Sequence, residues 1–319
     1  MTSPYPLQNW IPINLTFHPT DGWHSYWLDF RDKGFAEPFF EETISIARAR
    51  HLERSALKSW SDMDFLLQAA ETIPALSPTA FIFHVSRCGS TLLTQAFSTQ
   101  KENIVISEAP ILDEILRAGE KDPAIGDDQS EKWFKAALNL MGQQRNFKES
   151  TFIIKLDCWH IHFYDQLRNW FPDTPFFFLS RRPDEVLASH EKRRGMHAVP
   201  GLVSKSLLKI DPAVDYGGDF NVYTADVLQQ LYLEYNRVCQ LHNPKNYFFD
   251  YADGVEKMVL EFSLHSAIEV PNNEQLLHRL NYHSKYAGQI FTGDLPPAEG
   301  KFFYQNCMMA YYQLLNNAK

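Results

Sequence analysis

Five short runs of consecutive apolar residues stand out in the middle and later parts of the chain. They lie at 80–85, 103–107, 151–155, 175–180 and 246–250. Runs of this length that are apolar almost throughout are typical of strands covered by helices on both faces, since neither face is left for water. Segments with apolar residues at helical spacing separate the runs. This alternation predicts an α/β fold around a parallel sheet of about five strands.

The first 75 residues follow a different pattern. Two stretches, 39–54 and 61–73, carry apolar residues at helical spacing, and prolines then interrupt the chain before the first apolar run. We therefore expect residues 1–75 to form a mainly helical N-terminal appendage. Residues 76–319 are expected to form the α/β domain, which ends in a helical tail.

The segment 196–221 fits neither the strand pattern nor the helix pattern, and it reads as a long loop. Loops of this length without secondary structure are uncommon in compact domains unless they have a function. We therefore interpret this segment as a candidate lid over a substrate.

The overall composition is that of a folded globular protein, with 45% hydrophobic and 22% charged residues. The 39 acidic and 30 basic residues give a formal net charge of −9, which disfavours binding to nucleic acid or to an acidic membrane surface. The four cysteines are too far apart for a zinc-ribbon or dithiol motif. The sequence shows neither a secretory leader nor a run of about 18 apolar residues, so we expect a soluble cytoplasmic protein without a membrane span.

The first apolar run leads directly into a loop of small residues and then a helix. Residues 84–93 read HVSRCGSTLL, which predicts a turn followed by a helix that begins at Ser90. Gly89 permits close approach of the backbone, and the first N–H groups of the helix can bind an anion together with the hydroxyls of Ser90 and Thr91. Arg87 precedes the glycine, whereas an NTP-hydrolysing loop has a lysine after its last glycine. The turn therefore indicates a phosphate-binding site, and an ordinary strand-to-helix turn is the alternative.

A second segment, 176–194, has a related layout. An apolar strand is followed by Arg181 and then by a helix on which Ser189 and Arg193 lie four positions apart, on one face. In open parallel sheets ligands bind outside the carboxyl ends of the strands. We therefore expect these three groups to converge on one phosphate, at the same edge of the sheet as the first loop. A solvated basic helix face is the alternative.

Together, SRxGSTLL after one strand and FLxRxPxxVxxS after a later one resemble the sulfotransferase superfamily, closest to its protein-tyrosine sulfotransferase-like and bacterial branch. The resemblance covers about residues 80–251. It implies a P-loop-like three-layer sandwich that binds 3′-phosphoadenosine 5′-phosphosulfate (PAPS) as co-substrate. The implied reaction is in-line transfer of the sulfuryl group to a hydroxyl or phenol of a small-molecule or peptide acceptor, without a metal.

The resemblance also implies roles for individual residues. The implied donor contacts are Arg87, Cys88, Gly89, Ser90 and Thr91 at the 5′-phosphosulfate, Arg181 and Ser189 at the 3′-phosphate, and Arg193 and Lys285 as further contacts. Glu108, just after the second strand, is the implied general base, and Lys155, at the end of the third strand, is expected to stabilise the bridging oxygen. Asp157 is the reserve candidate for the base.

Each catalytic candidate has a structural alternative. Glu108 could instead complement the dipole of the helix that begins at 110, and Lys155 could be a strand-end lysine that reaches solvent. For the whole protein, the alternatives are a P-loop-type nucleotide-dependent kinase or NTPase and a non-catalytic nucleotide-binding protein of the same fold. The missing lysine after Gly89 argues against the kinase or NTPase, as does the lack of an obvious apolar strand ending in two acidic residues.

Overall fold

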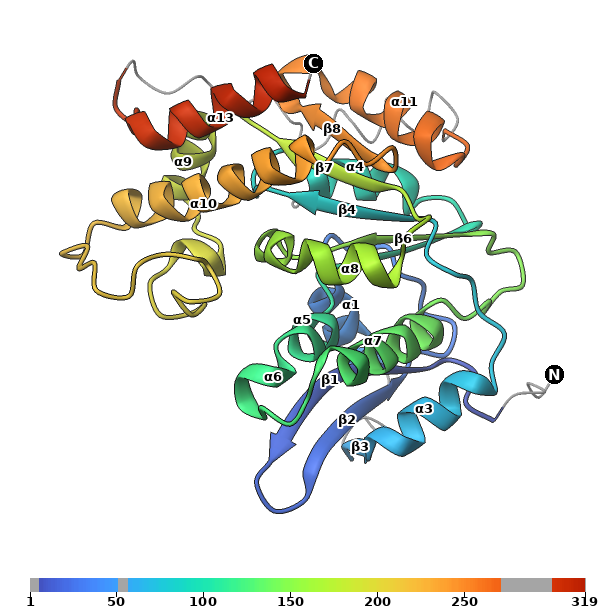
Figure 1. Cartoon of the computed structure of the whole chain (residues 1–319). Helices are drawn as coiled ribbons and strands as arrows, with labels where there is room; N and C mark the ends of the chain where they lie inside the picture. The colour runs from blue at the N-terminus through green and yellow to red at the C-terminus, as the bar shows by residue number, and fades with distance from the viewer. Residues whose placement is uncertain (1–5, 51–56, 271–299, 319) are drawn as a thin grey trace. The chain divides into compact units, whose positions relative to one another are not determined.

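The computed structural model describes residues 6–50, 57–270 and 300–318, in which two sheets are present (Figure 1). The first sheet is antiparallel and has the strand order β1-β2-β3. The second is parallel and has the order β5-β6-β4-β7-β8. Helices flank the parallel sheet, which confirms the predicted α/β fold with five central strands.

The described residues form the following elements. The strands are β1 (Trp10–His18), β2 (Gly22–Asp29), β3 (Ser59–Ser61), β4 (Ala80–His84), β5 (Asn103–Ser107), β6 (Thr151–Lys155), β7 (Phe176–Ser180) and β8 (Asn246–Asp250). The α-helices are α1 (Phe40–Arg50), α3 (Met63–Glu71), α4 (Ser90–Phe97), α5 (Pro110–Leu116), α6 (Ala118–Lys121), α7 (Asp127–Met141), α8 (Tyr164–Trp170), α9 (Pro183–Lys192), α10 (Phe220–Gln240), α11 (Val255–Ser266) and α13 (Gln305–Asn317). The 3₁₀ helices are η1 (Cys158–Phe163), η2 (Met196–Ala198) and η3 (Tyr251–Asp253). Each parallel strand begins and ends within one residue of its prediction. Among the helices of the described residues, none combines the length and apolar character needed to cross a bilayer.

The chain divides into two compact units. The first comprises Met1–Phe81 and Thr94–Leu156, and the second comprises Ile82–Leu93 and Asp157–Lys319. The first unit therefore joins the N-terminal appendage to the segment that carries β5, α5, α7 and β6. The boundary at residue 75, as the end of a separate domain, stays a prediction.

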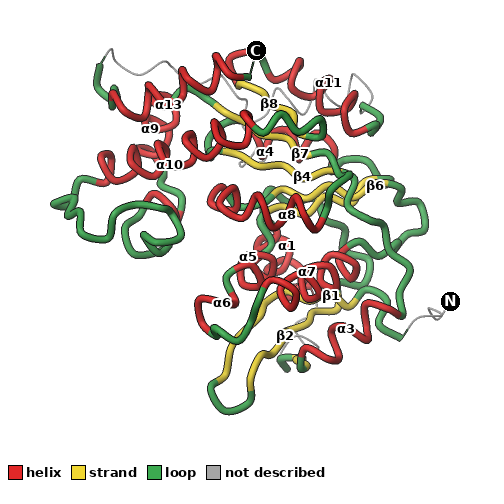
Figure 2. Tube along the Cα trace, viewed as in Figure 1, coloured by secondary structure: helices red, strands yellow, loops and turns green. Residues whose placement is uncertain are grey.

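The appendage contains a β-hairpin that the sequence analysis did not predict. β1 and β2 pair antiparallel, and β3 adds to the other side of β2; Figure 2 shows the two long strands in yellow. The structure thus corrects the expectation of a mainly helical appendage. The physical reason lies in β1, where Ile11, Ile13 and Leu15 alternate along the sequence with the period of a strand and not of a helix, although a bulge between Pro12 and Asn14 interrupts the alternation of faces.

Helix α5 packs on β1 through a buried carboxylate. Glu114 accepts hydrogen bonds from the backbone N–H of Leu15 and, at 3.4 Å, from the side-chain amide of Asn14. Burial raises the pKa of Glu114 to about 7, and these two donors offset the rise only in part. This carboxylate therefore changes its charge near neutral pH.

Stacked aromatic rings form part of the core of the second unit. The ring of Phe178 in β7 lies between Phe83 of β4, at 4.9 Å between centroids, and Phe248 of β8, at 4.7 Å. Tyr235 of α10 meets the Phe178 ring edge-on. Helix α13, the predicted helical tail, lies alongside α10 (Figure 1). This packing supports the ends of β4 and β7, which lead into the candidate functional site.

Candidate functional site

The loop between β4 and α4 has an unusual backbone. Ser86, Arg87 and Gly89 have positive φ values of 69°, 52° and 83°. Two of these residues are not glycine, and the left-handed conformation costs a non-glycine residue roughly 1–2 kcal/mol. Helix α4 begins directly afterwards at Ser90, so its first N–H groups have no acceptor within the helix. A tight turn that leads into a helix N-terminus is typical of anion-binding loops.

Gly89 is required here for a second reason. A Cβ atom at this position would lie 2.9 Å from two carbons of the Tyr251 ring, closer than real contacts allow. Tyr251 follows β8 in the 3₁₀ helix η3. The ring of Tyr251 therefore packs directly against the loop backbone. The guanidinium of Arg181 lies over the same ring, with its Cζ 4.4 Å from the ring centroid.

Arg181 is buried directly after the end of β7 and stabilises the loop between β4 and α4. Its Nη1 donates a hydrogen bond of 2.9 Å to the backbone carbonyl of Arg87, and its Nε donates one of 2.8 Å to Glu185. The hydroxyl of Tyr232 donates to the carbonyl of Arg181. The structure therefore brings together the two motifs that the sequence analysis expected to meet.

The end of α9 also contacts the loop. The guanidinium of Arg87 donates through Nη2 to the backbone carbonyl of Arg193, and the N–H of Arg193 donates to the carbonyl of Ser189 at 3.2 Å. The side chain of Arg193 is exposed, and Ser189 is half-buried. Helix α9 ends at Lys192 and Arg193 is extended, so Arg193 does not belong to the helix on which the sequence analysis placed it with Ser189.

The remaining loop residues differ in what they can offer a ligand. Ser90 and Thr91 are buried in the first turn of α4. The Cys88 side chain is fully buried beside Tyr232 and Tyr235 of α10, and burial raises the pKa of both tyrosines well above the ordinary value. The thiol of Cys88 therefore belongs to the core, and only its backbone can contact an anion.

The first unit pairs the two residues that were assigned catalytic roles. β5 and β6 are parallel, with Ser107 opposite Lys155, and the Glu108 N–H donates to the Lys155 carbonyl at 2.8 Å. The Nζ of Lys155 lies 2.7 Å from Oε1 of Glu108. The side chain of Lys155 is 0% exposed and that of Glu108 is 21% exposed. The alternative in which Lys155 reaches solvent is therefore wrong.

Two further features define this pair. The Lys155 ammonium lies 4.9 Å from the centroid of the Phe39 ring, which covers it on one side. Glu108 has a φ of 54°, a strained conformation for a residue that is not glycine. The strain turns the chain sharply between β5 and α5, and the carboxylate is directed to Lys155.

Asp157, the reserve candidate for the base, has another role. Its carboxylate accepts a backbone N–H at the start of η1, and its own N–H donates to Nδ1 of His160 at 3.2 Å, which together form a capping box. The choice of Glu108 over Asp157 as the base stays a prediction.

Two sequence predictions concern other parts of the chain. Lys285 lies in 271–299, outside the described residues. The predicted lid is irregular apart from η2 and its last two residues, which begin α10. Within it, the ammonium of Lys205 donates to the carbonyls of Pro212 and Val214 at 3.2 and 2.6 Å. Its loop character is confirmed, and its role as a lid stays a prediction.

The sequence analysis missed several supporting residues. Glu185 lies four positions after Arg181, and the two side chains form an ion pair at 2.8 Å. This spacing could have indicated the pair from the sequence. No local signal points to Phe39 or Tyr232, because each reaches the site from a distant segment. These residues orient the charged groups that the sequence analysis did name.

Comparisons with known proteins give a limited picture. No family model matches the chain, and no curated protein matches it. A solved sulfotransferase from Alicyclobacillus acidocaldarius is 12% identical over 62% of this chain and 85% of its own, with a TM-score of 0.39. A sulfotransferase from Mycobacterium tuberculosis is 12% identical over 67% of this chain and 75% of its own, with a TM-score of 0.40. Similarities of this size do not identify a family, so the function proposed below rests on the residues themselves.

Proposed function

We propose that this protein is a sulfotransferase that uses PAPS as donor and a hydroxyl or phenol as acceptor. The observation that carries the proposal is the hydrogen bond from Arg181 to the carbonyl of Arg87, two residues 94 positions apart. It joins the end of β7 to the strained loop after β4. A donor with phosphate groups at both ends of its ribose needs such a site, with two separate anion-binding segments held together.

The donor site would use backbone and side-chain groups of the second unit. The loop N–H groups and the hydroxyls of Ser90 and Thr91 are suited to the 5′-phosphosulfate. Ser189 in the last turn of α9 and Arg193, which follows the helix directly, are suited to the 3′-phosphate, since arginine offers a planar fork of donors. Arg181, already bonded to the loop, would hold the 5′-phosphosulfate site and the 3′-phosphate site in a fixed position relative to each other.

The transfer step would use the pair in the first unit. Oxygen of the acceptor hydroxyl forms a bond to sulfur as the bond from sulfur to the 5′-phosphate oxygen breaks, and adenosine 3′,5′-bisphosphate leaves. The acceptor proton passes to the carboxylate of Glu108. Neutralising Glu108 would remove the counter-charge of Lys155, so that the ammonium could stabilise negative charge on the leaving oxygen.

Ligand binding to the full chain tests the donor. Adenosine 3′,5′-bisphosphate should stabilise the protein, by about 2.7 kcal/mol at a hundredfold excess over its Kd. Adenosine 5′-monophosphate, which lacks the 3′-phosphate, should stabilise it much less. Stabilisation by ATP with magnesium, and none by the bisphosphate, would support the kinase or NTPase reading instead.

A matched pair of variants tests the site. Arg181→Lys keeps the charge but loses the fork that reaches both the loop carbonyl and Glu185, and it should weaken bisphosphate binding about tenfold, measured by calorimetry. The neighbouring Arg182 is exposed and pairs only with Asp184 among the described ion pairs, so Arg182→Lys should leave the affinity unchanged. Equal effects of the two changes would contradict the assignment.

A further inference from the structure

The connection between β2 and α1, residues 30–39, brings the N-terminal appendage next to the proposed catalytic pair. Its last residue, Phe39, carries the ring that lies 4.9 Å from the ammonium of Lys155. That ammonium in turn lies 2.7 Å from the carboxylate of Glu108. All three residues belong to the first unit. The resemblance to sulfotransferases begins only at about residue 80, so it assigns no role to this ring.

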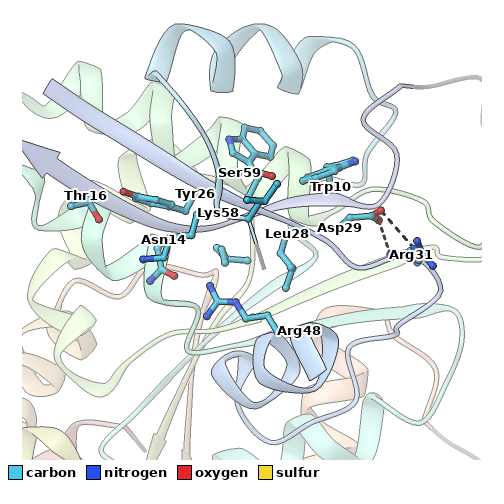
Figure 3. Close-up of a pocket in the computed structure, with 13 residues that line it drawn as sticks. Trp10, Asn14, Thr16, Tyr26, Leu28, Asp29, Arg31, Arg48, Lys58 and Ser59 are labelled. Carbon is cyan, nitrogen blue, oxygen red and sulfur yellow. Dashed lines mark hydrogen bonds and ion pairs between the residues drawn. The ribbon is translucent and has the colours of Figure 1, made fainter. Parts of the chain in front are cut away.

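The β2–α1 connection is fixed where it leaves the antiparallel sheet. The carboxylate of Asp29 accepts the backbone N–H of Arg31 at 3.0 Å and lies 3.9 Å from the Nε of the same residue (Figure 3). Arg145, from the loop after α7, donates through Nη2 to the carbonyls of Arg31 and Lys33 at 2.7 and 2.8 Å. Its guanidinium also lies 4.7 Å from the centroid of the Phe35 ring. These contacts hold the first half of the connection.

A buried ion pair fixes the second half. Lys33 is 5% exposed, and its ammonium lies 2.7 Å from the carboxylate of Glu37. The same carboxylate accepts the hydroxyl of Thr43 in α1, also at 2.7 Å. Gln95 of α4 donates to the carbonyl of Ala36 at 2.9 Å. Breaking a buried ion pair is strongly destabilising, so these contacts hold the residues that precede Phe39 in place.

Phe39 itself stands at the start of α1. Its carbonyl accepts the N–H groups of Glu42 and Thr43 at 3.1 and 3.3 Å, which fixes its backbone. Its side chain is half-buried, and that of Glu108 is 21% exposed. The ring and the carboxylate thus border the same buried ammonium, and both keep some exposed surface. An acceptor held at Glu108 therefore has this ring as a near neighbour.

A phenylalanine ring beside the carboxylate that binds the hydroxyl favours an acceptor that is itself aromatic. Two aromatic rings with centroids about 4.5–7 Å apart, offset-stacked or edge-on, gain more than their apolar contact alone. A phenol also loses its proton at a pKa of about 10, far below that of an aliphatic alcohol, which suits a carboxylate as base. A saturated alcohol has neither advantage.

We propose that Phe39 determines the specificity for the acceptor: the ring of a phenol lies against the Phe39 ring while its hydroxyl donates to Glu108. This inference rests on the proposed function and narrows its acceptors from hydroxyl compounds to aromatic ones. The N-terminal appendage then has a definite task, which is to hold Phe39 at this place through the contacts of the β2–α1 connection.

Acceptor binding to the full chain tests the proposal without requiring turnover. With adenosine 3′,5′-bisphosphate at saturation, 2-naphthol should bind at least about threefold more tightly than decahydro-2-naphthol, which has the same carbon skeleton and hydroxyl but no aromatic ring. Calorimetry measures both affinities. Equal affinities, or tighter binding of the saturated alcohol, would overturn the inference. Failure of the bisphosphate to bind would instead overturn the proposed function, on which the inference rests.

Variants of Phe39 locate the effect. Phe39→Leu keeps an apolar side chain but removes the ring, and it should weaken 2-naphthol binding about three- to tenfold while decahydro-2-naphthol binds as before. Phe39→Tyr keeps a ring and should retain the affinity for 2-naphthol. The matched control is Phe147→Leu, which removes a ring that is 68% exposed elsewhere in the same unit and should change neither affinity.

The affinity for the bisphosphate shows whether each variant is folded, and it should be the same in all three. No loss of 2-naphthol affinity in Phe39→Leu, or an equal loss in Phe147→Leu, would show that Phe39 does not select the acceptor. Either result would leave the proposed donor site intact, because the bisphosphate would still bind.

Discussion

The two compact units hold their buried charges in different ways. In the second unit, the guanidinium of Arg181 is bonded to a backbone carbonyl and to Glu185. Arginine does not lose its proton in proteins, so this charge is fixed. In the first unit, the corresponding groups are partly buried carboxylates: Glu108 beside the Lys155 ammonium, and Glu114 with two N–H donors.

This difference matters for the proposed reaction. Binding a phosphate requires positive groups whose charge does not depend on the state of the reaction. Accepting a proton from a hydroxyl requires a carboxylate that can change its charge. The contrast therefore indicates that changes in the second unit should act mainly on donor affinity, whereas changes at Glu108 should act mainly on turnover.

Glu108→Gln is the most severe test of this contrast. It removes the proposed base but keeps an oxygen that can accept a hydrogen bond from Lys155. Turnover of PAPS with 4-nitrophenol should fall by about 10²- to 10⁴-fold, the usual contribution of a general base. The affinity for adenosine 3′,5′-bisphosphate should stay unchanged.

The matched control is Glu120→Gln, which removes a carboxylate that pairs with Arg117 near the surface of the same unit. This variant should keep full turnover. Near-normal turnover of Glu108→Gln would exclude Glu108 as the base, and an equally large loss of donor affinity would contradict the division of roles between the units.

The second test uses the pH dependence of stability. The pKa of Glu114 is about 7 in the folded protein and 4.5 without burial, so the folded state binds this proton more tightly. The resulting stabilisation is complete below pH 4.5 and is lost as the pH rises through 7. The difference corresponds to about 3 kcal/mol of unfolding free energy, from about 1.4 kcal/mol for each pKa unit.

Glu114→Gln should remove this dependence, and urea unfolding at a series of pH values would measure it. Glu131→Gln, at a half-exposed position where the carboxylate pairs with Lys135, should keep the dependence. If the free energy of unfolding of Glu114→Gln falls between pH 4.5 and 8 as steeply as that of the unchanged protein, another group is responsible for the pH dependence.

The smallest expected effect concerns the loop backbone. Gly89→Ala forces a left-handed residue, which costs about 1–2 kcal/mol, and adds a methyl group that collides with Tyr251. Gly34→Ala is the matched control, because its φ is not in the left-handed region and no atom lies within 4 Å of the added Cβ.

Denaturant unfolding of Gly89→Ala, alone and combined with Tyr251→Ala, separates the two causes. Removing the tyrosine ring should relieve the collision and leave the cost of the backbone conformation. Additive effects of the two changes would mean that the ring does not restrict this position.

Most of the parallel sheet could be predicted from the sequence because its signal is local. The run FFFL in β7, for example, is apolar on both faces and cannot be anything but a covered strand or a buried helix segment, and its length decides between them. The hairpin was missed because its strands show alternation in place of continuous apolar runs, and a bulge between Pro12 and Asn14 interrupts the alternation in β1. Its identity depends on the pairing of β1 with β2, which one segment alone does not reveal.

The candidate site was predictable to a similar extent. The meeting of Arg181 with the loop follows from a rule of topology, since both come after strands of one parallel sheet. Glu108 and Lys155 were each named, but their ion pair depends on the register that sets Ser107 opposite Lys155. The packing of Tyr251 on Gly89 links residues far apart in the sequence, and no local pattern encodes it.

The hydrogen bond from the Leu15 N–H to Glu114 affects whether the edge of the antiparallel sheet can pair with a strand of another chain. β1 is an outer strand of the antiparallel sheet. Outer strands present N–H groups that can recruit a strand from a neighbouring chain and so begin aggregation. By taking one of these groups, α5 blocks a position at which a foreign strand would attach. At this position the hairpin is thus protected by a helix nearly a hundred positions later in the chain.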